Sequence, residues 1–369
     1  MIENKKIRLG ILFGGKSAEH EVSLISAKNI IEGLDREKYE VLLIGIDKTG
    51  EWRLRDDYSY LMHQDDPQLV QLKNTEDCIA LVPTRNRKEL VNCLDNQLQQ
   101  SLKLDVIFPV LHGTYGEDGT VQGLLKLANI PFVGAGVLGS AIGMDKDVMK
   151  RLLRDAQIPI AKFRVLHAYD NTDHVYEQMV SQIGTPFFLK PANSGSSVGI
   201  SKVRTKEEFE RSLENAFLYD RKVLVEEFIE GREIECSVLG NDHPIVSLPG
   251  EVIPQHDFYS YEAKYLDEGG AQFQIPVTLP SEIEQKIQEI AVRAYRALCC
   301  EGMARIDFFL KESGEIFVNE INTIPGFTKI SMYPKLWVAS GLSYSHLLDR
   351  LIELAIERHE KESRLKTTF

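Results

Sequence analysis

No apolar run in the sequence approaches the roughly 20 residues that a membrane-spanning helix requires. Cysteine is scarce: there are five, at scattered positions without the spacing of a metal site, so reduced thiols in the cytoplasm are expected. Positive charge is in the minority, because 43 lysines and arginines face 55 acidic residues and the net charge is -12. Nucleic acid and anionic lipid would repel such a chain. We therefore expect a cytoplasmic protein that binds neither nucleic acid nor a membrane.

Two common nucleotide-binding motifs are missing as well. The turn after the first expected strand reads FGGKSAEHE, which does not fit GxGxxG, and no ribose-binding acid follows the second strand. A dehydrogenase with a dinucleotide-binding domain is therefore not supported. The Walker A pattern GxxxxGKS/T is also absent, and no serine or cysteine stands in a triad-like arrangement. A nucleotide site in this chain must be built from other residues.

The length and composition are those of a globular protein with two or three domains: 369 residues, of which 43% are hydrophobic and 27% charged. Apolar runs at 7–13 and 39–46 predict buried strands, and a helix over about 18–33, capped by Ser17, connects them. This strand, helix, strand order indicates an α/β fold. A composition shift at 134–143, a run of small residues, marks the first domain boundary.

The most informative stretch is a predicted β-hairpin near the C-terminus. Apolar runs at 305–310 and 316–322 flank a turn signal at Ser313 and the glycine after it. A two-residue loop would pair Glu312 with Glu315, and a four-residue loop gives the same pairing further along. This pairing fixes which side chains of the two strands lie opposite each other.

Four polar side chains then share one face of the hairpin. Asp307 falls opposite Glu320, and Arg305 falls opposite Asn322. Opposed carboxylates repel each other, and a bound cation would remove the repulsion. Because every donor is an oxygen atom, a hard ion such as Mg2+ is favoured, and Arg305 would suit a phosphate or an oxyanion. A solvated polar face with a structural Arg–Asp pair is the open alternative.

A second pattern indicates phosphate binding. Lys190 ends a predicted strand over 186–190, and the loop PANSGSSVGISKV follows it. Glycines let backbone N–H groups approach an anion, hydroxyl groups donate hydrogen bonds, and the lysine supplies charge. The alternative is a flexible hairpin or linker, but the phosphate loop is the favoured interpretation.

Two polar residues are expected at the ends of the first parallel strands, where ligands bind in open α/β sheets. His112 follows the strand over 105–111, and Glu19 follows the Gly14-Gly15 turn. Glu19 can face the ammonium group of a ligand or simply complement the helix dipole. His112 can be a ligand contact or a satisfied loop histidine.

Three other regions carry weaker signals. Residues 51–100 are polar and irregular, and we interpret them as an insertion with little site content. The acidic loop 230–233 could offer Glu233 to ribose hydroxyls or be a plain hairpin. The aromatic loop over 251–276, which holds Lys264 and Tyr265, has the length of an active-site lid.

Taken in order, six motifs resemble one known family. They are LFGGKSAEHEVSL, FPVLHGTYGEDGTVQG, the triplet Met144-Asp145-Lys146, KPANSGSSVGISKV, YEAKY, and RIDFFL with VNEINTIPGFTKIS. Together they resemble the ATP-grasp superfamily and, within it, the D-alanine–D-alanine ligase family. The resemblance covers nearly the whole chain except residues 51–100 and the C-terminal tail.

The resemblance implies a three-domain ATP-grasp architecture of α/β (α+β) class. The N-terminal domain, 1–140, would hold an open parallel sheet on the side of the first D-alanine. The central domain, 141–234, would carry the phosphate loop. The C-terminal domain, 235–369, would carry the lid, the metal site and the site of the second D-alanine. A homodimer is implied as well.

The implied activity is the ATP-dependent joining of two D-alanines through an acyl phosphate, with ADP as a product, for peptidoglycan precursor synthesis. Two alternatives stay open: a D-alanine–D-lactate ligase, and a nucleotide-binding homologue without ligase activity. Tyr265 within EAKY is similar to the dipeptide-forming kind. Every position matched to a catalytic role keeps a workable residue, which argues against the inactive homologue.

The resemblance also assigns residues to ATP and metal. The nucleotide contacts are Lys146, Lys190, Ser197, Glu226, Glu227, Phe228, Ile229, Glu233 and Lys264. Two Mg2+ ions, for which Mn2+ could substitute, would be bound by Asp307, Glu320 and Asn322.

The amino acid sites follow in the same way. Glu19 would take the ammonium group of the first D-alanine, held by Ser196 and Tyr265, with His112 beside that substrate. Arg305 and the backbone of Gly326 would form the oxyanion site. The carboxylate of the second D-alanine would be received by Ser331 and Met332, where the family commonly has leucine instead of methionine.

Overall fold

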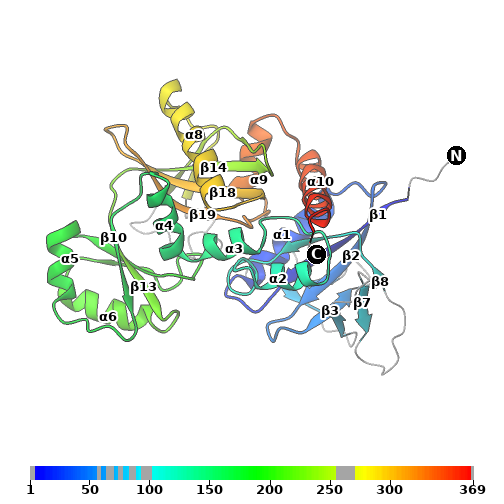
Figure 1. The fold of residues 1–369 in the computed structure, drawn as a ribbon, viewed down its shortest axis with the longest axis horizontal. Coiled ribbons are helices and arrows are strands. Elements are labelled where there is room, and N and C mark those ends of the chain that lie inside the picture. The colour runs from blue at the N-terminus through cyan, green and yellow to red at the C-terminus, as the bar shows by residue number, and fades with distance from the viewer. Residues whose placement is uncertain are drawn as a thin grey trace.

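Three main β-sheets organise the chain (Figure 1). The computed structural model describes residues 5–55, 60–63, 70–73, 78–82, 89–92, 102–254 and 271–366. The first sheet lies at one end of the elongated molecule. The second lies at the other end with α5 (Val175–Ile183) and α6 (Lys206–Ala216), and the third lies between them. The predicted mixed α/β class is confirmed.

The first sheet is the open parallel sheet expected from the N-terminal sequence. β1 (Ile7–Gly14) pairs in parallel with β2 (Tyr39–Ile46) on one side and with β9 (Val106–Val110) on the other. β3 (Trp52–Arg55) adds an antiparallel edge, and α1 (His20–Gly33) connects β1 to β2. The continuous apolar sequences suit strands covered on both faces. The chain passes from β1 to β2 on one side and later adds β9 on the other, so the strand order reverses at β1. A crevice for ligands is therefore expected at the carboxyl ends of β1 and β9.

The start of α1 differs from the prediction, because the helix begins at His20 and Ser17 does not cap it. The Ser17 hydroxyl accepts a hydrogen bond from the Glu19 N–H (3.2 Å) and donates one to the His112 carbonyl (2.8 Å). The capping position is occupied by Glu19, whose side chain makes no capping bond. The carboxylate of Glu19 is therefore directed to partners outside the helix.

The interpretation of residues 51–100 as irregular is wrong for the part that the structure describes. Besides β3, short strands form at β4 (Leu61–Met62), β5 (Gln71–Leu72), β6 (Ile79–Leu81) and β7 (Glu89–Asn92), with β8 (Leu102–Lys103) beside β7. Tyr60, Leu61 and Val70 are buried in the core around the first sheet. Strands this short show too little alternation to be recognised from sequence.

The second sheet is antiparallel, in the order β10 (Phe163–His167), β13 (Lys222–Glu227), β11 (Phe187–Pro191) and β12 (Ser201–Val203). The phosphate-loop sequence connects β11 to β12. A capping box at Thr205 begins α6, which packs with α5 over the core of this sheet.

The third sheet has the order β17 (Ala271–Gln274), β16 (Gly250–Pro254), β14 (Arg232–Gly240), β18 (Gly302–Leu310) and β19 (Ile316–Asn322), with β15 (Ile245–Val246) beside β14. The apolar side chains of β18 alternate with polar ones. Ile306 and Phe308 lie in a core with Ile287 and Ile290 of α8 (Ser281–Ala297). The opposite face of β18 and β19 is thus left for the polar residues.

Five further helices in the described part of the chain join the sheets. α4 (Lys146–Asp155) is capped by Asp145, which accepts from two backbone N–H groups, and follows α3 (Val137–Met144). The apolar residues of α4 pack into the core of the third sheet. α10 (Tyr344–Ser363) packs on the first sheet, next to α9 (Met332–Ala339). α2 (Thr120–Leu127) follows the loop after β9. The domain limits at 140 and 234 remain predictions.

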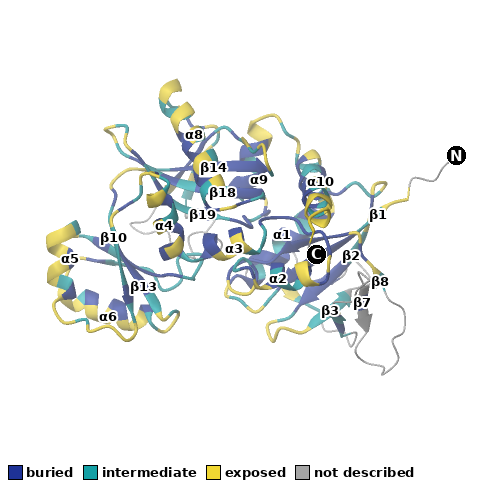
Figure 2. Cartoon of the chain, viewed as in Figure 1, coloured by how far each residue is buried: buried dark blue, intermediate teal, exposed yellow. Residues whose placement is uncertain are grey.

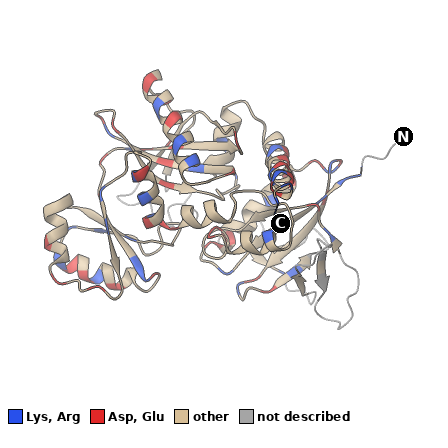
Figure 3. Cartoon of the chain, in the orientation of Figure 1, with Lys and Arg blue, Asp and Glu red and all other residues tan. Residues whose placement is uncertain are grey.

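Burial and charge follow this arrangement. In Figure 2 the central strands of the sheets are buried, whereas the outer faces of α5, α6 and α8 are exposed. Figure 3 shows acidic and basic residues interspersed along α6, α8 and α10. Within the described ranges, the search for a helix long and apolar enough to span a membrane finds none.

Candidate active site

The polar face of the β18–β19 hairpin has the register that the sequence predicts. Asp307 pairs with Glu320, and Arg305 pairs with Asn322. All four side chains are partly buried, while Ile306 and Ile321 between them are buried in the core. Two carboxylates and an amide therefore face one side of the sheet together with one guanidinium group.

The turn of the hairpin differs from the prediction. Glu312 does not pair with Glu315; instead Lys311 does, with its N–H 3.0 Å from the Glu315 carbonyl oxygen. A register shift directly after Asp307 on β18 absorbs the one-residue difference, and Asn319 is the extra residue on β19. The bulge explains why a wrong turn still gave the right pairing at the site.

Arg305 is held by acids in this face. Its Nε and Nη2 donate to the two carboxylate oxygens of Asp307, each at 2.7 Å, and Asn322 Nδ2 donates to Asp307 at 3.2 Å. Burial opposes the charge of Arg305, but the carboxylates of Asp307 and Glu235 hold its pKa well above the ordinary range. The Arg–Asp pair of the alternative interpretation is present, within a site that contains further acids.

The sequence analysis did not identify Glu235. It lies on β14 opposite Asp307, is 8% exposed, and its Oε2 is 2.9 Å from Arg305 Nε. Three carboxylates, of Glu235, Asp307 and Glu320, thus form one row across β14, β18 and β19. The prediction placed Glu233 in a loop and began a strand near Glu235, whereas both residues lie on β14, and only the pairing of β14 with β18 shows that Glu235 belongs to the site.

Glu19 is buried where loops from two sheets meet. Its carboxylate accepts a hydrogen bond from the Ser196 hydroxyl in the loop after β11. A Cβ atom added at Gly113 or Gly195 would lie 2.6 Å or 2.8 Å from Glu19 Oε2. These glycines, one from the first sheet and one from the phosphate loop, are therefore needed to let both loops close on the carboxylate.

Glu117 is a second acid that the sequence analysis missed. Its Oε2 accepts the N–H of Gly113 at 2.9 Å, so it lies on the other side of that glycine from Glu19. Burial and then the charge of Glu19 raise the pKa of Glu117 to about 8. Glu117 is therefore mostly protonated near neutral pH.

Replacing Glu117 with glutamine should change the pH dependence of stability. The folded-state pKa of about 8 lies above the ordinary 4.5, so the protonated acid stabilises the fold below about pH 4.5 and this contribution is lost as the pH rises through 8. The variant lacks this loss. From about pH 5 to about pH 9, we expect its free energy of unfolding to gain about 2 kcal/mol or more relative to the parent.

Urea unfolding at several pH values measures this difference for Glu117→Gln. Glu37→Gln changes an exposed glutamate in the connection between α1 and β2 and is the matched control. Its free energy of unfolding should depend on pH as that of the parent does. Parallel curves for Glu117→Gln and the parent would show that Glu117 titrates normally in the folded chain.

His112 links the first sheet to the loop after β19. Its Nδ1 is 3.0 Å from the Ile324 carbonyl oxygen and therefore carries the proton, which leaves Nε2 to accept from the Ser26 hydroxyl at 3.3 Å. Ser26 in turn accepts the N–H of Phe327 at 3.2 Å. Burial lowers the pKa of His112 to about 4, so it is neutral. His112 positions the loop that carries Gly326, and Ser26 is a partner that the sequence did not reveal.

The residues expected to hold a nucleotide gather around β11 and β13. Lys190 Nζ lies 3.0 Å from Glu226 Oε1 and 3.3 Å from Asn319 Oδ1. Lys150, which the sequence analysis missed, is 1% exposed and lies 3.1 Å from Glu226 Oε2. Burial opposes ionisation, but these two ammonium groups hold the pKa of Glu226 below its ordinary value. The Glu226 side chain is therefore occupied by lysines, and its backbone lies inside the sheet between Phe163 of β10 and Phe188 of β11.

The other nucleotide residues surround this cluster. Lys146 Nζ donates to the Ser194 carbonyl at 2.6 Å, at the start of the phosphate loop. The loop turns sharply at Ser197, whose φ is +61°. Glu227 accepts the N–H of Lys162 at 3.1 Å. The remaining members are Phe228, under Lys202 at 4.0 Å, the buried Ile229, and Glu233 on the cavity side of β14. Lys264 and Tyr265 lie outside the described residues.

The residues expected around the second amino acid lie at the N-terminus of α9. Ser331 precedes the helix, and its hydroxyl accepts the N–H of Thr328 at 3.0 Å instead of capping α9. A Cβ atom at Gly326 would lie 2.8 Å from Ser331 Oγ, so this turn requires glycine. Met332 is buried against Val252. The backbone N–H groups in the first turn of α9 are suited to binding an anion.

One cavity of about 140 Å³ brings these groups together. Its lining includes the predicted residues Glu19, His112, Ser196, Glu233, Arg305, Asp307, Glu320, Asn322, Gly326, Ser331 and Met332, together with Glu117 and Glu235. Lys146, Lys190, Ser197 and Glu226 through Ile229 do not line it. Lys190 adjoins it through Asn319, which does.

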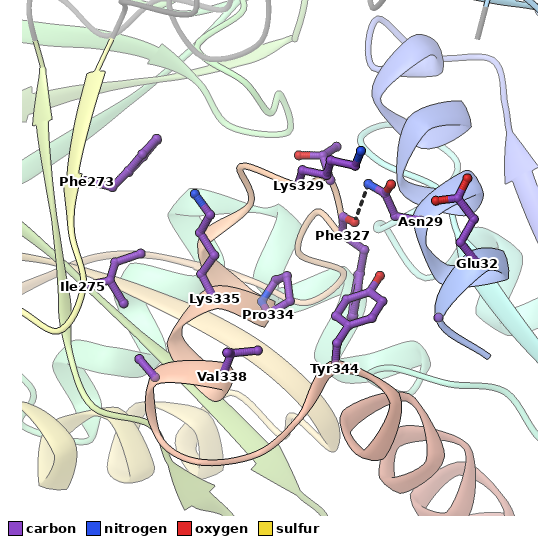
Figure 4. A pocket seen from close by; sticks show the side chains of 13 residues that line it. Asn29, Glu32, Phe273, Ile275, Phe327, Lys329, Pro334, Lys335, Val338 and Tyr344 are labelled. Atoms are coloured by element: carbon purple, nitrogen blue, oxygen red, sulfur yellow. Dashed lines mark hydrogen bonds between the residues drawn. The ribbon is translucent and has the colours of Figure 1, made fainter. Parts of the chain in front are cut away.

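A larger pocket of about 710 Å³ opens beside this cavity and shares Phe273 and Thr328 with it. Figure 4 shows it between α1, α9 and β17, with Lys329 and Lys335 at its edge. The hydrogen bond from Asn29 Nδ2 to the Phe327 carbonyl (3.1 Å) closes one side. The polar cavity therefore adjoins a pocket with a mainly apolar lining.

Two family models match the chain: "D-ala D-ala ligase N-terminus" over residues 8–135 and "D-ala D-ala ligase C-terminus" over residues 152–353. The D-alanine--D-alanine ligase of Shouchella clausii (strain KSM-K16) is 53% identical over 363 residues, which is 98% of each chain. D-alanine--D-alanine ligase A of Escherichia coli (strain K12) is 52% identical over 365 residues, 99% of this chain and 100% of that one.

Solved structures agree with these relatives. The D-alanine-D-alanine ligase from Coxiella burnetii matches with a TM-score of 0.84 and 41% identity, over 97% of this chain and 96% of that one. The VanG D-Ala:D-Ser ligase from Enterococcus faecalis matches with a TM-score of 0.82 and 36% identity, over 95% of this chain and 100% of that one. Since the family models and the relatives extend over nearly the whole sequence, the chain belongs to the D-alanine–D-alanine ligase family.

Proposed function

We propose that the chain joins two D-alanine molecules to D-alanyl-D-alanine at the expense of ATP, which yields ADP and phosphate. One observation carries the proposal: Glu19, Arg305 and the paired Asp307 and Glu320 line a single cavity that ends at the N-terminus of α9. That order of charges suits an ammonium group, a reacting carboxylate with phosphates, and a second carboxylate. The product would serve peptidoglycan precursor synthesis.

The hairpin face fits a divalent cation. Asp307 and Glu320 are opposed like charges on neighbouring strands, and Asn322 adds a third oxygen donor on the same face. We propose that these residues bind two Mg2+ ions, for which Mn2+ can substitute, because Mg2+ prefers one or two carboxylates plus substrate phosphates. When bound, the metal neutralises charge on the transferred phosphoryl group.

The residues around β11 and β13 support a nucleotide site. Lys146 and Lys190 supply positive charge near the start of the phosphate loop, and the loop turns at Ser197. We propose that both lysines contact the phosphates, that the segment from Glu226 through Ile229 holds the adenine, and that Glu233 holds the ribose. We further propose that Lys264 supports the phosphates and that Tyr265 closes the lid over the site.

The chemistry proceeds in two displacements. The carboxylate of the first D-alanine, oriented through its ammonium group by Glu19 and Ser196, attacks the γ-phosphorus, and the bond to the bridging oxygen of ADP breaks. The amine of the second D-alanine then attacks the acyl carbon, and inorganic phosphate leaves. Arg305 and the Gly326 N–H stabilise the oxyanion of the tetrahedral intermediate, which forms when the amine attacks and is lost when phosphate leaves. His112 holds the Gly326 loop, and Ser331 with Met332 receives the second carboxylate.

The acceptor is the part of the reaction with a specific rival. The Enterococcus faecalis neighbour is titled a D-Ala:D-Ser ligase and shares the fold at 36% identity. A hydroxy acid such as D-lactate is the other candidate acceptor. The family relatives at 52% and 53% identity, both D-alanine--D-alanine ligases, favour D-alanine.

The test is phosphate release from ATP and Mg2+ with D-alanine, L-alanine, D-alanine plus D-serine, or D-alanine plus D-lactate, with products identified by mass. We expect release with D-alanine and the D-alanyl-D-alanine dipeptide as the main product in every mixture that contains it. A mixed dipeptide or a depsipeptide as the main product would reassign the acceptor. No release with any mixture would overturn the proposal.

We also propose a homodimer in the cytoplasm. Cys236, Cys299 and Cys300 are thiols without a disulfide in the described chain, which suits a reducing compartment. The family resemblance is the support for the dimer, and sedimentation at working concentration measures it directly.

A further inference from the structure

We propose that Glu235 is a positioning residue, which keeps the guanidinium group of Arg305 in its working orientation while Asp307 binds the metal. The inference rests on the proposed function, because it concerns how Arg305 acts in that reaction. It adds a residue that neither the sequence motifs nor the family resemblance singled out.

Glu235 and Arg305 meet because of the register of the third sheet. Glu235 on β14 is the direct neighbour of Asp307, and Arg305 lies two residues before Asp307 on the same face of β18. Arg305 Nε is 2.7 Å from Asp307 Oδ1, to which its N–H donates, and 2.9 Å from Glu235 Oε2, which makes an ion pair with it without a hydrogen bond. Two acids on two strands therefore fix one guanidinium group.

The two acids are not equivalent, because only one of them also faces the metal site. Asp307 lies opposite Glu320 on β19, whereas Glu235 lies on the far side of β18 from Glu320. Once Asp307 binds a divalent cation, its attraction for Arg305 weakens, since its charge is then largely neutralised. Glu235 keeps its full charge and becomes the main partner of Arg305. It can thus hold the guanidinium group in both states of the site.

Burial makes this partner effective. Glu235 is 8% exposed and the Arg305 side chain is 19% exposed, so their attraction is screened much less than that of a surface pair. The residue beside Glu235 on β16 is Gly250, where an added Cβ atom would lie 2.7 Å from Met332 Cε. Met332 thus covers this part of the sheet and limits the access of water.

The experiment compares Glu235→Gln with Glu251→Gln. Glu251 is an equally well-matched control: it is 7% exposed, lies in the same sheet, and pairs with Arg232 at 2.8 Å and 2.6 Å, but it does not line the catalytic cavity. We expect Glu235→Gln to lower kcat by about 10-fold to 100-fold, because a misplaced catalytic group loses this much rate. KM for ATP and calorimetric binding of ADP should stay within about twofold of the parent. Glu251→Gln should keep the parent's kcat.

A double variant separates positioning from a general loss of stability. If Glu235 acts through Arg305, then Glu235→Gln should cause no further loss of kcat in the Arg305→Ala background. Losses that multiply, or equal effects of Glu235→Gln and Glu251→Gln on kcat, would overturn the proposal. Glu235→Asp provides a second variant should Glu235→Gln unfold: it keeps the charge at a greater distance, so its kcat should lie between those of the parent and Arg305→Ala. A parent without ligase activity would instead overturn the proposed function, and this inference with it.

Discussion

Replacing Arg305 with alanine should lower kcat by about 100-fold or more, because one lost oxyanion donor typically costs about 3–4 kcal/mol of transition-state stabilisation. Arg305 is the cation on the polar face of β18 and β19, and its Nη2 and Nε reach Asp307 at 2.7 Å each. Its charge is thus placed beside the carboxylates that we propose bind the metal, where the phosphate and the tetrahedral intermediate would lie. The expected loss is in turnover, since the guanidinium group contributes most where negative charge develops.

Nucleotide binding should survive this substitution. Lys146 and Lys190, which we assign to the phosphates, lie around the second sheet and have their own partners in Ser194 and Glu226. Calorimetry with ADP and Mg2+ measures this separately from kcat. Arg232→Ala, which removes an arginine from the same sheet without touching the cavity, is the control and should keep the parent's kcat. An unchanged kcat in Arg305→Ala would remove Arg305 from the oxyanion site.

The sequence was most informative where local rules decide the structure. The pairing of Asp307 with Glu320 followed from strand alternation and a turn signal, and it holds although the turn itself is different. The prediction survived because a bulge at Asn319 compensates for the one-residue change in the turn, where Lys311 instead of Glu312 pairs with Glu315. A bulge leaves little trace in a single sequence, since any residue type can occupy it.

The site residues that could not be predicted from the sequence have one feature in common. Glu117, Lys150, Glu235 and Ser26 are polar residues whose partners are distant in sequence: Ser26 meets His112 and Phe327, and Lys150 meets Glu226. Along the chain, each resembles an ordinary surface residue of a helix, strand or loop. Their burial, which makes them informative, results from contacts with elements that are distant in the sequence. Tertiary contacts of this kind are not encoded in local periodicity.

Replacing Glu320 with glutamine should abolish turnover that depends on the metal, with a loss of at least about 1000-fold, because a charged metal ligand contributes several kcal/mol to charge stabilisation. Glutamine keeps the size and shape of Glu320 but removes its charge. Only Asp307 then remains as a carboxylate of the predicted metal set, with Asn322 as a neutral donor. Raising the Mg2+ concentration should recover part of the activity.

The stability of this variant distinguishes a lost ligand from a damaged fold. In the metal-free chain Glu320 lies opposite Asp307, and opposed carboxylates destabilise a sheet. Glu320→Gln should therefore unfold at the same temperature as the parent or at a higher one without metal. When Mg2+ and ADP are added, its unfolding temperature should rise less than that of the parent, because a ligand that binds more weakly stabilises the folded state less. Glu312→Gln, at the exposed turn of the same hairpin, should match the parent in both measurements. Near-normal activity of Glu320→Gln at low Mg2+ would exclude Glu320 from the metal site.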